Sequence, residues 1–220
     1  KALFSRNTVW KTKRGQVEIE SERFVSLDEP HLIVMKYSIT ANFHADIELI
    51  TGIDGDVWDI HGPHYDYLSL SIKNNDLIAV GTTHENKDKV YVVETCKCDF
   101  VNETNYSVDD KRVLRHVSFI TDPGTKYTLT KWISVFTSRD DTGCRDESEA
   151  VRLVEDCSMK GYDHCRNAHI KKWEEKWSVS EVIIEGDDAA MEALNYSVYH
   201  LHSIAPRHAR SMSIAARGLS

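Results

Sequence analysis

Hydrophobic and polar residues alternate in short runs from the start of the chain to about residue 142. In the stretch 16–20, for example, Val17 and Ile19 alternate with polar residues, so one face of a strand there would contact a core while the other faces water. Clusters of Gly, Asn, Asp and Pro separate the runs. The pattern predicts β-strands at residues 8–13, 17–25, 32–40, 45–51, 68–73, 77–82, 90–98, 112–121 and 127–137.

Short turns join several of these runs. Arg-Gly at 14–15 separates the first two runs, and Asn-Asn-Asp at 74–76 separates the fifth from the sixth. Turns of this length connect antiparallel neighbours. Nine short strands without intervening helices therefore predict a mainly β fold, an antiparallel β-sandwich over residues 1–142.

Beyond residue 143 the hydrophobic period lengthens to that of α-helices. Gly161 is a stop signal between a first and a second helix, Asp187 or Asp188 is the expected N-cap of a third, and Pro206 would end it. The expected apolar positions are Ala150, Val151, Val154 and Cys157 in the first helix, Cys165, His169, Trp173 and Trp177 in the second, and Met191, Leu194, Val198 and Leu201 in the third.

The pattern thus divides the chain into three parts. They are the β-rich domain at 1–142, a two-helix linker at 143–180 and the start of a further helical domain at 181–220. The chain begins with Lys1 rather than methionine and ends on Gly-Leu-Ser without a polar tail. We therefore expect it to be cut at both ends.

Composition and charge narrow the class of protein. With 41% hydrophobic and 28% charged residues, the 220-residue chain has the balance of a folded protein. Its net charge of -8 argues against nucleic acid or an anionic membrane as the main partner. No apolar run approaches the length of a membrane span or a signal-peptide core, and the five cysteines form no CxxC pair. We expect a cytoplasmic protein with reduced thiols.

Two groups of residues could bind metal, and each has a simpler interpretation. An acidic loop carries side chains that could suggest calcium, but its spacing departs from the EF-hand pattern, so an ordered surface loop is favoured. Cys165 and His169 share a helix face with Cys157 one helix earlier, yet no fourth ligand has suitable spacing, so a packed connector helix is favoured. The loop residues are Asp54, Asp56, Asp59, His61, His64 and Asp66.

Trp173 and Trp177 are four residues apart and could stack on a sugar, although such a pair more often docks a helix on a sheet. The acid-free segment 201–220 could bind phosphate or sugar hydroxyls, because guanidinium groups give paired donors to oxyanions. Its alternative role is a basic helix C-terminus that offsets the helix dipole. The candidate binding residues of this segment are Arg207, His208, Arg210, Ser213 and Arg217.

Taken in order, several short segments of the chain resemble glycoside hydrolase family 65, the inverting disaccharide phosphorylases. His169, Trp173 and Trp177 belong to the resemblance. The other matching segments are ERFVS at 22–26, SIT at 38–40, TGIDGDV at 51–57, FTSRD at 136–140, IEGD at 184–187, ALNY at 193–196 and SIAARGLS at 213–220.

The resemblance implies a fold and a reaction. The family architecture is a large β-sandwich, a helical linker, an (α/α)₆ barrel and a small β-domain, of which this chain resembles most of the sandwich, the linker and the first barrel helix. A glutamate deep in the barrel protonates the glycosidic oxygen while inorganic phosphate attacks the anomeric carbon, without a cofactor. That glutamate lies beyond residue 220, so we expect this chain alone to be inactive.

Within such an enzyme the chain would provide scaffold and a homodimer surface, and the segment 207–219 would border the active-site mouth. The apolar stripe of the third helix would then lack a barrel to bury it. Two alternatives remain: a trehalose-type hydrolase of the same family, and a free-standing carbohydrate-binding sandwich in which Trp58, Tyr65 and Tyr67 stack on sugars.

Overall fold

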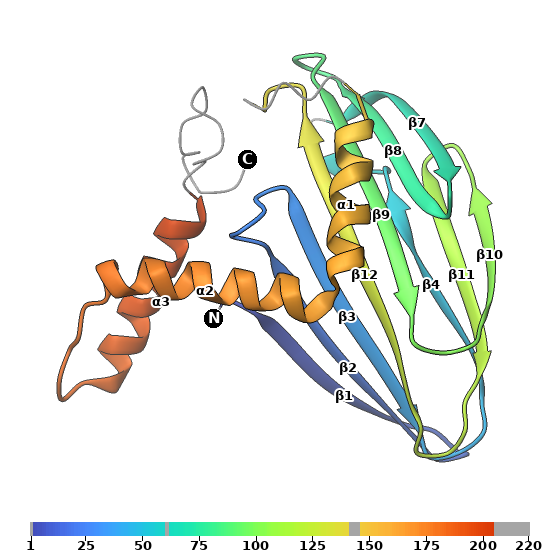
Figure 1. The fold of residues 1–220 in the computed structure, drawn as a ribbon, viewed down its shortest axis with the longest axis horizontal. Helices are drawn as coiled ribbons and strands as arrows, with labels where there is room; N and C mark the ends of the chain where they lie inside the picture. The colour runs from blue at the N-terminus through green and yellow to red at the C-terminus, as the bar shows by residue number, and fades with distance from the viewer. Residues whose placement is uncertain (1, 60–61, 141–145, 205–220) are drawn as a thin grey trace.

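The computed structural model describes residues 2–59, 62–140 and 146–204, which form twelve strands and three helices (Figure 1). All strand pairs are antiparallel. In spatial order the large sheet contains β1 (Phe4–Lys11), β2 (Gln16–Val25), β3 (Leu32–Ala41), β12 (Lys126–Thr137), β9 (Lys89–Cys98), β8 (Asp76–Thr83) and β7 (Tyr65–Lys73). The small sheet contains β10 (Glu103–Val108), β11 (Arg112–Ile120) and β4 (Asp46–Asp54), and β5 (Trp58–Asp59) pairs with β6 (Gly62–Pro63).

The mainly β prediction is confirmed, and each of the nine predicted strands is present with ends shifted by a few residues. The predicted turn between β7 and β8 consists of Asn74 and Asn75, whose φ angles of 51° and 72° are left-handed. Asparagine tolerates this conformation better than most residues, and two such residues match the twist of a tight hairpin. The local sequence therefore fixes the register of this strand pair.

The alternation did not predict β10, the outer strand of the small sheet. Five of its six residues are exposed, so neither of its faces carries a run of apolar residues. Its pairing with β11 comes from backbone hydrogen bonds along a sheet edge, which leave no hydrophobic signal in the sequence. Strands β5 and β6 were not predicted either, because two residues are too few to show an alternation.

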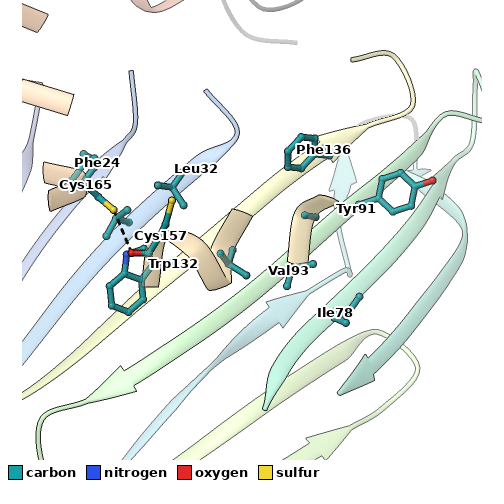
Figure 2. Packing of buried hydrophobic residues seen from close by; sticks show 12 residues of the cluster. Phe24, Leu32, Ile78, Tyr91, Val93, Trp132, Phe136, Cys157 and Cys165 are labelled. Atoms are coloured by element: carbon teal, nitrogen blue, oxygen red, sulfur yellow. Dashed lines mark hydrogen bonds between the residues drawn. The ribbon is translucent and has the colours of Figure 1, made fainter. Parts of the chain in front are cut away.

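The large sheet is covered on both faces (Figure 1). The small sheet packs on one face, where Val17, Ile39, Ala41 and Phe119 form a buried cluster. Helix α1 (Ser148–Lys160) lies across the other face, and Figure 2 shows the larger cluster beneath it. Its buried members are Phe24, Leu32, Val34, Ile78, Tyr91, Val93, Trp132, Phe136, Ala150, Val154, Cys157 and Cys165.

The predicted helices are also present. After α1 come α2 (Tyr162–Ser180) and α3 (Asp188–Ile204), and the Asp187 side chain caps α3 by accepting a hydrogen bond from the Ala190 amide at 2.9 Å. Pro206, the predicted end signal, lies outside the described residues. None of the helices in the described ranges has the length and apolar character that crossing a bilayer requires.

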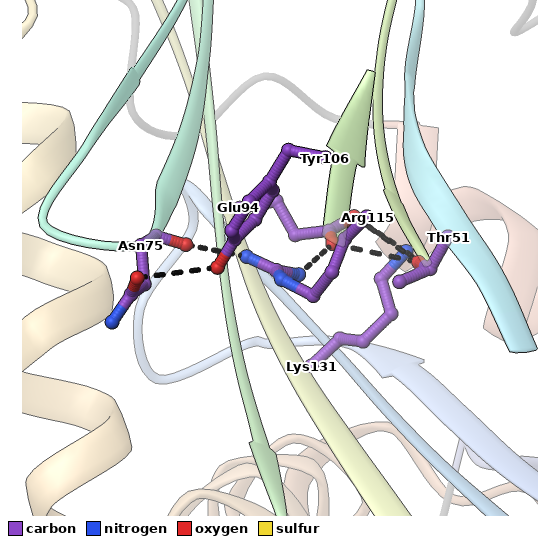
Figure 3. Close-up of polar contacts among 6 residues, drawn as sticks. All are labelled: Thr51, Asn75, Glu94, Tyr106, Arg115 and Lys131. Carbon is purple, nitrogen blue, oxygen red and sulfur yellow. Dashed lines mark hydrogen bonds and ion pairs between the residues drawn. The ribbon is translucent and has the colours of Figure 1, made fainter. Parts of the chain in front are cut away.

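A buried ionic cluster joins the two sheets (Figure 3). Glu94 of β9 accepts a hydrogen bond from Arg115 of β11 at 2.6 Å and forms an ion pair with Lys131 of β12 at 2.5 Å. The Arg115 guanidinium also donates to the carbonyl of Asn75 at 2.6 Å, and the Thr51 hydroxyl is 3.4 Å from the Glu94 carboxylate. Glu94 and Arg115 are 1% and 4% exposed, so their charges compensate each other away from water.

Candidate functional site between helices α2 and α3 and the sheet

His169 anchors helix α2 to the sheet. It is fully buried, and the Leu27 amide donates to its Nδ1 at 3.1 Å. The ring proton is therefore on Nε2, which donates to the Ala2 carbonyl at 3.1 Å. The imidazole also packs on the Phe24 ring with centroids 4.7 Å apart. Both nitrogens thus hold backbone groups, which explains why His169 belongs to a packed helix rather than to a metal site.

Glu22 provides a second anchor. Arg166 donates to its carboxylate at 2.8 Å, and the Tyr162 hydroxyl donates to the same oxygen. Partial burial raises the pKa of Glu22, but the hydrogen bonds from Tyr162 and Arg166 outweigh it and hold the pKa below its ordinary value. The carboxylate is therefore ionised at neutral pH and fixes the start of α2 against β2.

A groove of about 1310 Å³ lies between α2, α3 and the ends of the first strands. Arg23, Lys172 and Lys176 lie along it, together with Glu175. Most of the groove surface is nevertheless hydrocarbon, so the groove can bury an apolar protein surface. Its apolar lining includes Phe4, Val25, Leu27, Ile33, Trp177 and Tyr199.

Trp173 closes the floor of this groove. It is 4% exposed, and its ring lies 5.2 Å from that of Tyr199 on α3 and 6.5 Å from that of Trp177. Its indole N–H is buried and has no hydrogen-bond partner among the described residues. The interpretation of Trp173 as part of an apolar seam is confirmed, whereas the half-buried Trp177 faces the groove.

Helix α3 is the least buried of the three helices. None of its residues is buried, and Tyr196 and Leu201 are 66% and 64% exposed. The predicted stripe of Met191, Leu194 and Val198 is only half-buried. Within the ranges that the structure describes, α3 therefore has an apolar face that is only partly covered.

In its described residues the acidic loop after β4 is a surface loop, as interpreted, and His61 lies outside the described residues. The Asp56 amide donates to the Asp54 side chain at 2.9 Å, and Lys111 pairs with the Asp56 carboxylate at 2.6 Å. Asp66 pairs with His84 at 2.5 Å and also with Lys87. No group of three or more His, Cys, Asp or Glu side chains in the described residues is placed to hold a metal ion.

The aromatic residues of the alternative sugar platform do not share one environment. Trp58 and Tyr67 are 61% and 63% exposed, but Tyr65 is half-buried with its ring against Gly81. The Trp58 indole donates to Asp56 at 2.7 Å. Only Trp58 and Tyr67 remain as exposed stacking surfaces of that set.

The cationic candidates lie outside the described residues. They are Arg207, His208, Arg210, Ser213 and Arg217. The Glu94 cluster was not predicted, although one signal was present. Glu94, Cys96 and Cys98 are alternate residues of β9 and so lie on one face of the strand, which places a carboxylate among apolar positions.

The family of the chain follows from a comparison with known protein families. Residues 1–176 match the model of the glycosyl hydrolase family 65 N-terminal domain. The chain belongs to glycosyl hydrolase family 65. The match extends from the first strand through most of α2, so it includes both anchors of that helix.

Curated relatives agree with this assignment. Nigerose phosphorylase of Lachnoclostridium phytofermentans is 42% identical over 99% of this chain and 32% of its own length. Kojibiose phosphorylase of Escherichia coli is 30% identical over 98% of the chain and 29% of its length. The 1,2-alpha-glucosylglycerol phosphorylase of Bacillus selenitireducens is 32% identical over 98% of the chain and 28% of its own length. The chain thus spans less than a third of these relatives.

The fold agrees with that of a solved structure assigned as a kojibiose phosphorylase from the human microbiome. The two superpose with a TM-score of 0.81 at 14% identity, over 92% of this chain and 27% of the other. The similarity includes the strands and extends into the helices, because it covers nearly the whole chain.

Proposed function

We propose that the chain is the N-terminal scaffold of an inverting α-glucoside phosphorylase, which converts a disaccharide and inorganic phosphate to β-glucose 1-phosphate and a second sugar. The 42% identity to nigerose phosphorylase along 99% of the chain supports this proposal most directly. The relatives differ in the sugar they act on but are all phosphorylases by name. The proposal therefore commits to the type of reaction and not to a linkage.

In this reaction a glutamate outside the 220 residues protonates the glycosidic oxygen while phosphate attacks the anomeric carbon from the opposite face. Phosphate takes the place of the water that an inverting hydrolase would activate, so no cofactor is needed. The chain would hold the catalytic helices in position rather than supply the acid, and Glu185 and Glu192, both exposed, have no such role.

The partly exposed apolar face of α3 supports a scaffold role. We assign α3 as the first helix of the catalytic barrel, whose other helices would cover the stripe of Leu194, Val198 and Leu201. The segment 207–219, with its arginines, would then border the active-site mouth, where guanidinium groups can bind phosphate. A homodimer and a cytoplasmic location remain predictions.

A second candidate is a non-catalytic carbohydrate-binding module, favoured by the exposed rings of Trp58 and Tyr67. A titration of the 220-residue chain with nigerose, kojibiose and maltose separates the two proposals. The scaffold proposal predicts no binding and no glucose 1-phosphate when phosphate is added. Saturable binding that Trp58→Ala abolishes would favour the module, and phosphorolysis by the chain alone would overturn its assignment as an inactive scaffold.

A further inference from the structure

Two buried thiols lie together where α1 meets α2. Cys157 is in the last turn of α1 and Cys165 in the first turn of α2, and Gly161 between them has a φ of 87° that permits the sharp corner. The Cys165 thiol donates back to the Cys157 carbonyl, with the sulfur 3.7 Å from the oxygen. The two residues are 2% and 5% exposed, and Figure 2 shows the Cys165 sulfur pointing to the Cys157 carbonyl oxygen close to the Trp132 indole.

The surroundings of the pair make the two thiols unequal. A hydrogen bond from Cys157 lowers the pKa of Cys165 to about 7 despite burial, and the Trp132 indole and the Lys160 charge add to this effect. The hydrogen bond to Cys165 and burial raise the pKa of Cys157. The buried Trp132 indole N–H has no hydrogen-bond partner among the described residues, so it is free to donate to the Cys165 sulfur once that sulfur is ionised. Cys165 is therefore the more acidic thiol of the pair, and Cys157 is the one that keeps its proton.

We propose that Cys157 and Cys165 are a redox modification site that forms a reversible disulfide with hydrogen peroxide. The Cys165 thiolate attacks one peroxide oxygen, breaks the O–O bond and becomes a sulfenic acid while hydroxide leaves. The Cys157 sulfur then attacks the Cys165 sulfur, its proton and the sulfenic hydroxyl leave as water, and the S–S bond forms. Both thiols are thereby oxidised by two electrons in total, and the peroxide is reduced to water. The bond would staple the α1–α2 corner.

A second cysteine pair provides an internal comparison. Cys96 and Cys98 lie two residues apart on β9. An extended backbone places such Cα atoms roughly 6.7 Å apart, which is near the upper limit for a disulfide. Cys157 and Cys165 lie on two different helices, so no strand spacing fixes their separation. We therefore expect the Cys157–Cys165 disulfide to form first.

Peptide mapping after peroxide treatment of the folded chain tests the proposal. Trypsin releases Cys157 in LVEDCSMK and Cys165 in GYDHCR, because Arg152, Lys160 and Arg166 flank them. We expect a disulfide to join these two peptides and dithiothreitol to separate them again. The joined product should form before any Cys96–Cys98 disulfide, which would link VYVVETCK to the peptide that follows it. Absence of the joined peptide in the folded protein, or its formation only after unfolding, would overturn the proposal.

Single variants test the order of the two steps. In Cys157→Ser, dimedone should trap a sulfenic acid at Cys165, whereas Cys165→Ser should leave Cys157 unlabelled. Equal labelling of the two variants would contradict the assigned roles. Trp132→Phe keeps the ring but removes the N–H donor, so the midpoint of Cys165 alkylation should move to higher pH while Cys96 alkylation keeps its profile. An unchanged midpoint would exclude Trp132 as a positioning residue.

Discussion

At the scale of single residues, Glu94 holds two cations between the sheets. The cluster is buried, so the attraction between Glu94, Arg115 and Lys131 offsets a large desolvation cost only while all three charges are present. Removal of the anion leaves two cations close together in a largely buried space, where water screens them poorly. The cluster therefore makes the position of the small sheet on the large one depend on one carboxylate.

Glu94→Gln should lower the free energy of unfolding by about 3 to 5 kcal/mol, the usual effect of breaking a buried pair. Urea denaturation measures the change. Glu48→Gln is the matched control, because Glu48 pairs with His116 at 3.1 Å from an exposed position and should contribute far less. Similar losses from the two variants would show that burial of the Glu94 cluster has no special effect.

Glu22 predicts a pH dependence of stability. Its pKa in the folded chain lies below the ordinary value of 4.5, so the ionised carboxylate stabilises the fold above that pH. This contribution is lost as the pH falls through the folded-state pKa. Glu22→Gln should therefore flatten the decline of stability below about pH 4.5, measured by denaturation at a series of pH values. Glu20→Gln, at a half-exposed neighbour on β2 whose carboxylate pairs with Lys126, should change the slope far less, and a flattening as large as that of Glu22→Gln would contradict the assignment.

At the scale of elements, α2 is fixed by buried contacts and α3 is not. The α2 side chains Cys165, His169 and Trp173 are buried, while α3 contacts α2 mainly through Tyr199 and His202 against the two tryptophans. The expected consequence is a gradient of stability along the helices, since few buried contacts hold α3 in place.

Trp173→Ala should destabilise the chain by about 3 to 5 kcal/mol, because it removes a large buried ring from the α2 seam. Trp177→Ala is the comparison, and its half-buried ring should contribute less. The melting temperature of each variant measures the difference. An unchanged melting temperature for Trp173→Ala would contradict its place in the core.

Hydrogen exchange tests the gradient itself. Amides of α3 should exchange much faster than those of α1, which is packed on the sheet through Ala150 and Val154. Mass spectrometry of peptides from the two helices gives the comparison under one condition. Equal protection of α3 and α1 would show that the α3 stripe is covered in the isolated chain.

Local patterns predicted elements well and the contacts between them poorly. Val17 and Ile19 on β2, or Ala150, Val154 and Cys157 on α1, follow a period that a single element imposes, and the structure buries all of them except Ile19, which is half-buried. The two backbone groups that His169 binds, at Leu27 and Ala2, are 142 and 167 residues away in sequence, so no local pattern could indicate them. The polar edge strand β10 was missed because backbone pairing has no side-chain signature.

At the scale of the whole molecule, the chain is a two-sheet body with helices on one face and a partly exposed helical end. This arrangement suits a domain that supports another, and the relatives, more than three times as long, have room for one. The family assignment rests on residues 1–176, and the substrate-binding candidates from Arg207 to Arg217 stay predictions.

The product formed by the full-length gene product tests the central claim most directly. Incubated with nigerose and inorganic phosphate, or with kojibiose or maltose in turn, it should convert phosphate to β-glucose 1-phosphate in amounts equal to the sugar released, as followed by phosphorus NMR. Inversion requires the β-anomer from an α-linked substrate. Sugar release that is independent of phosphate and leaves the phosphate signal unchanged would contradict the assignment as a phosphorylase.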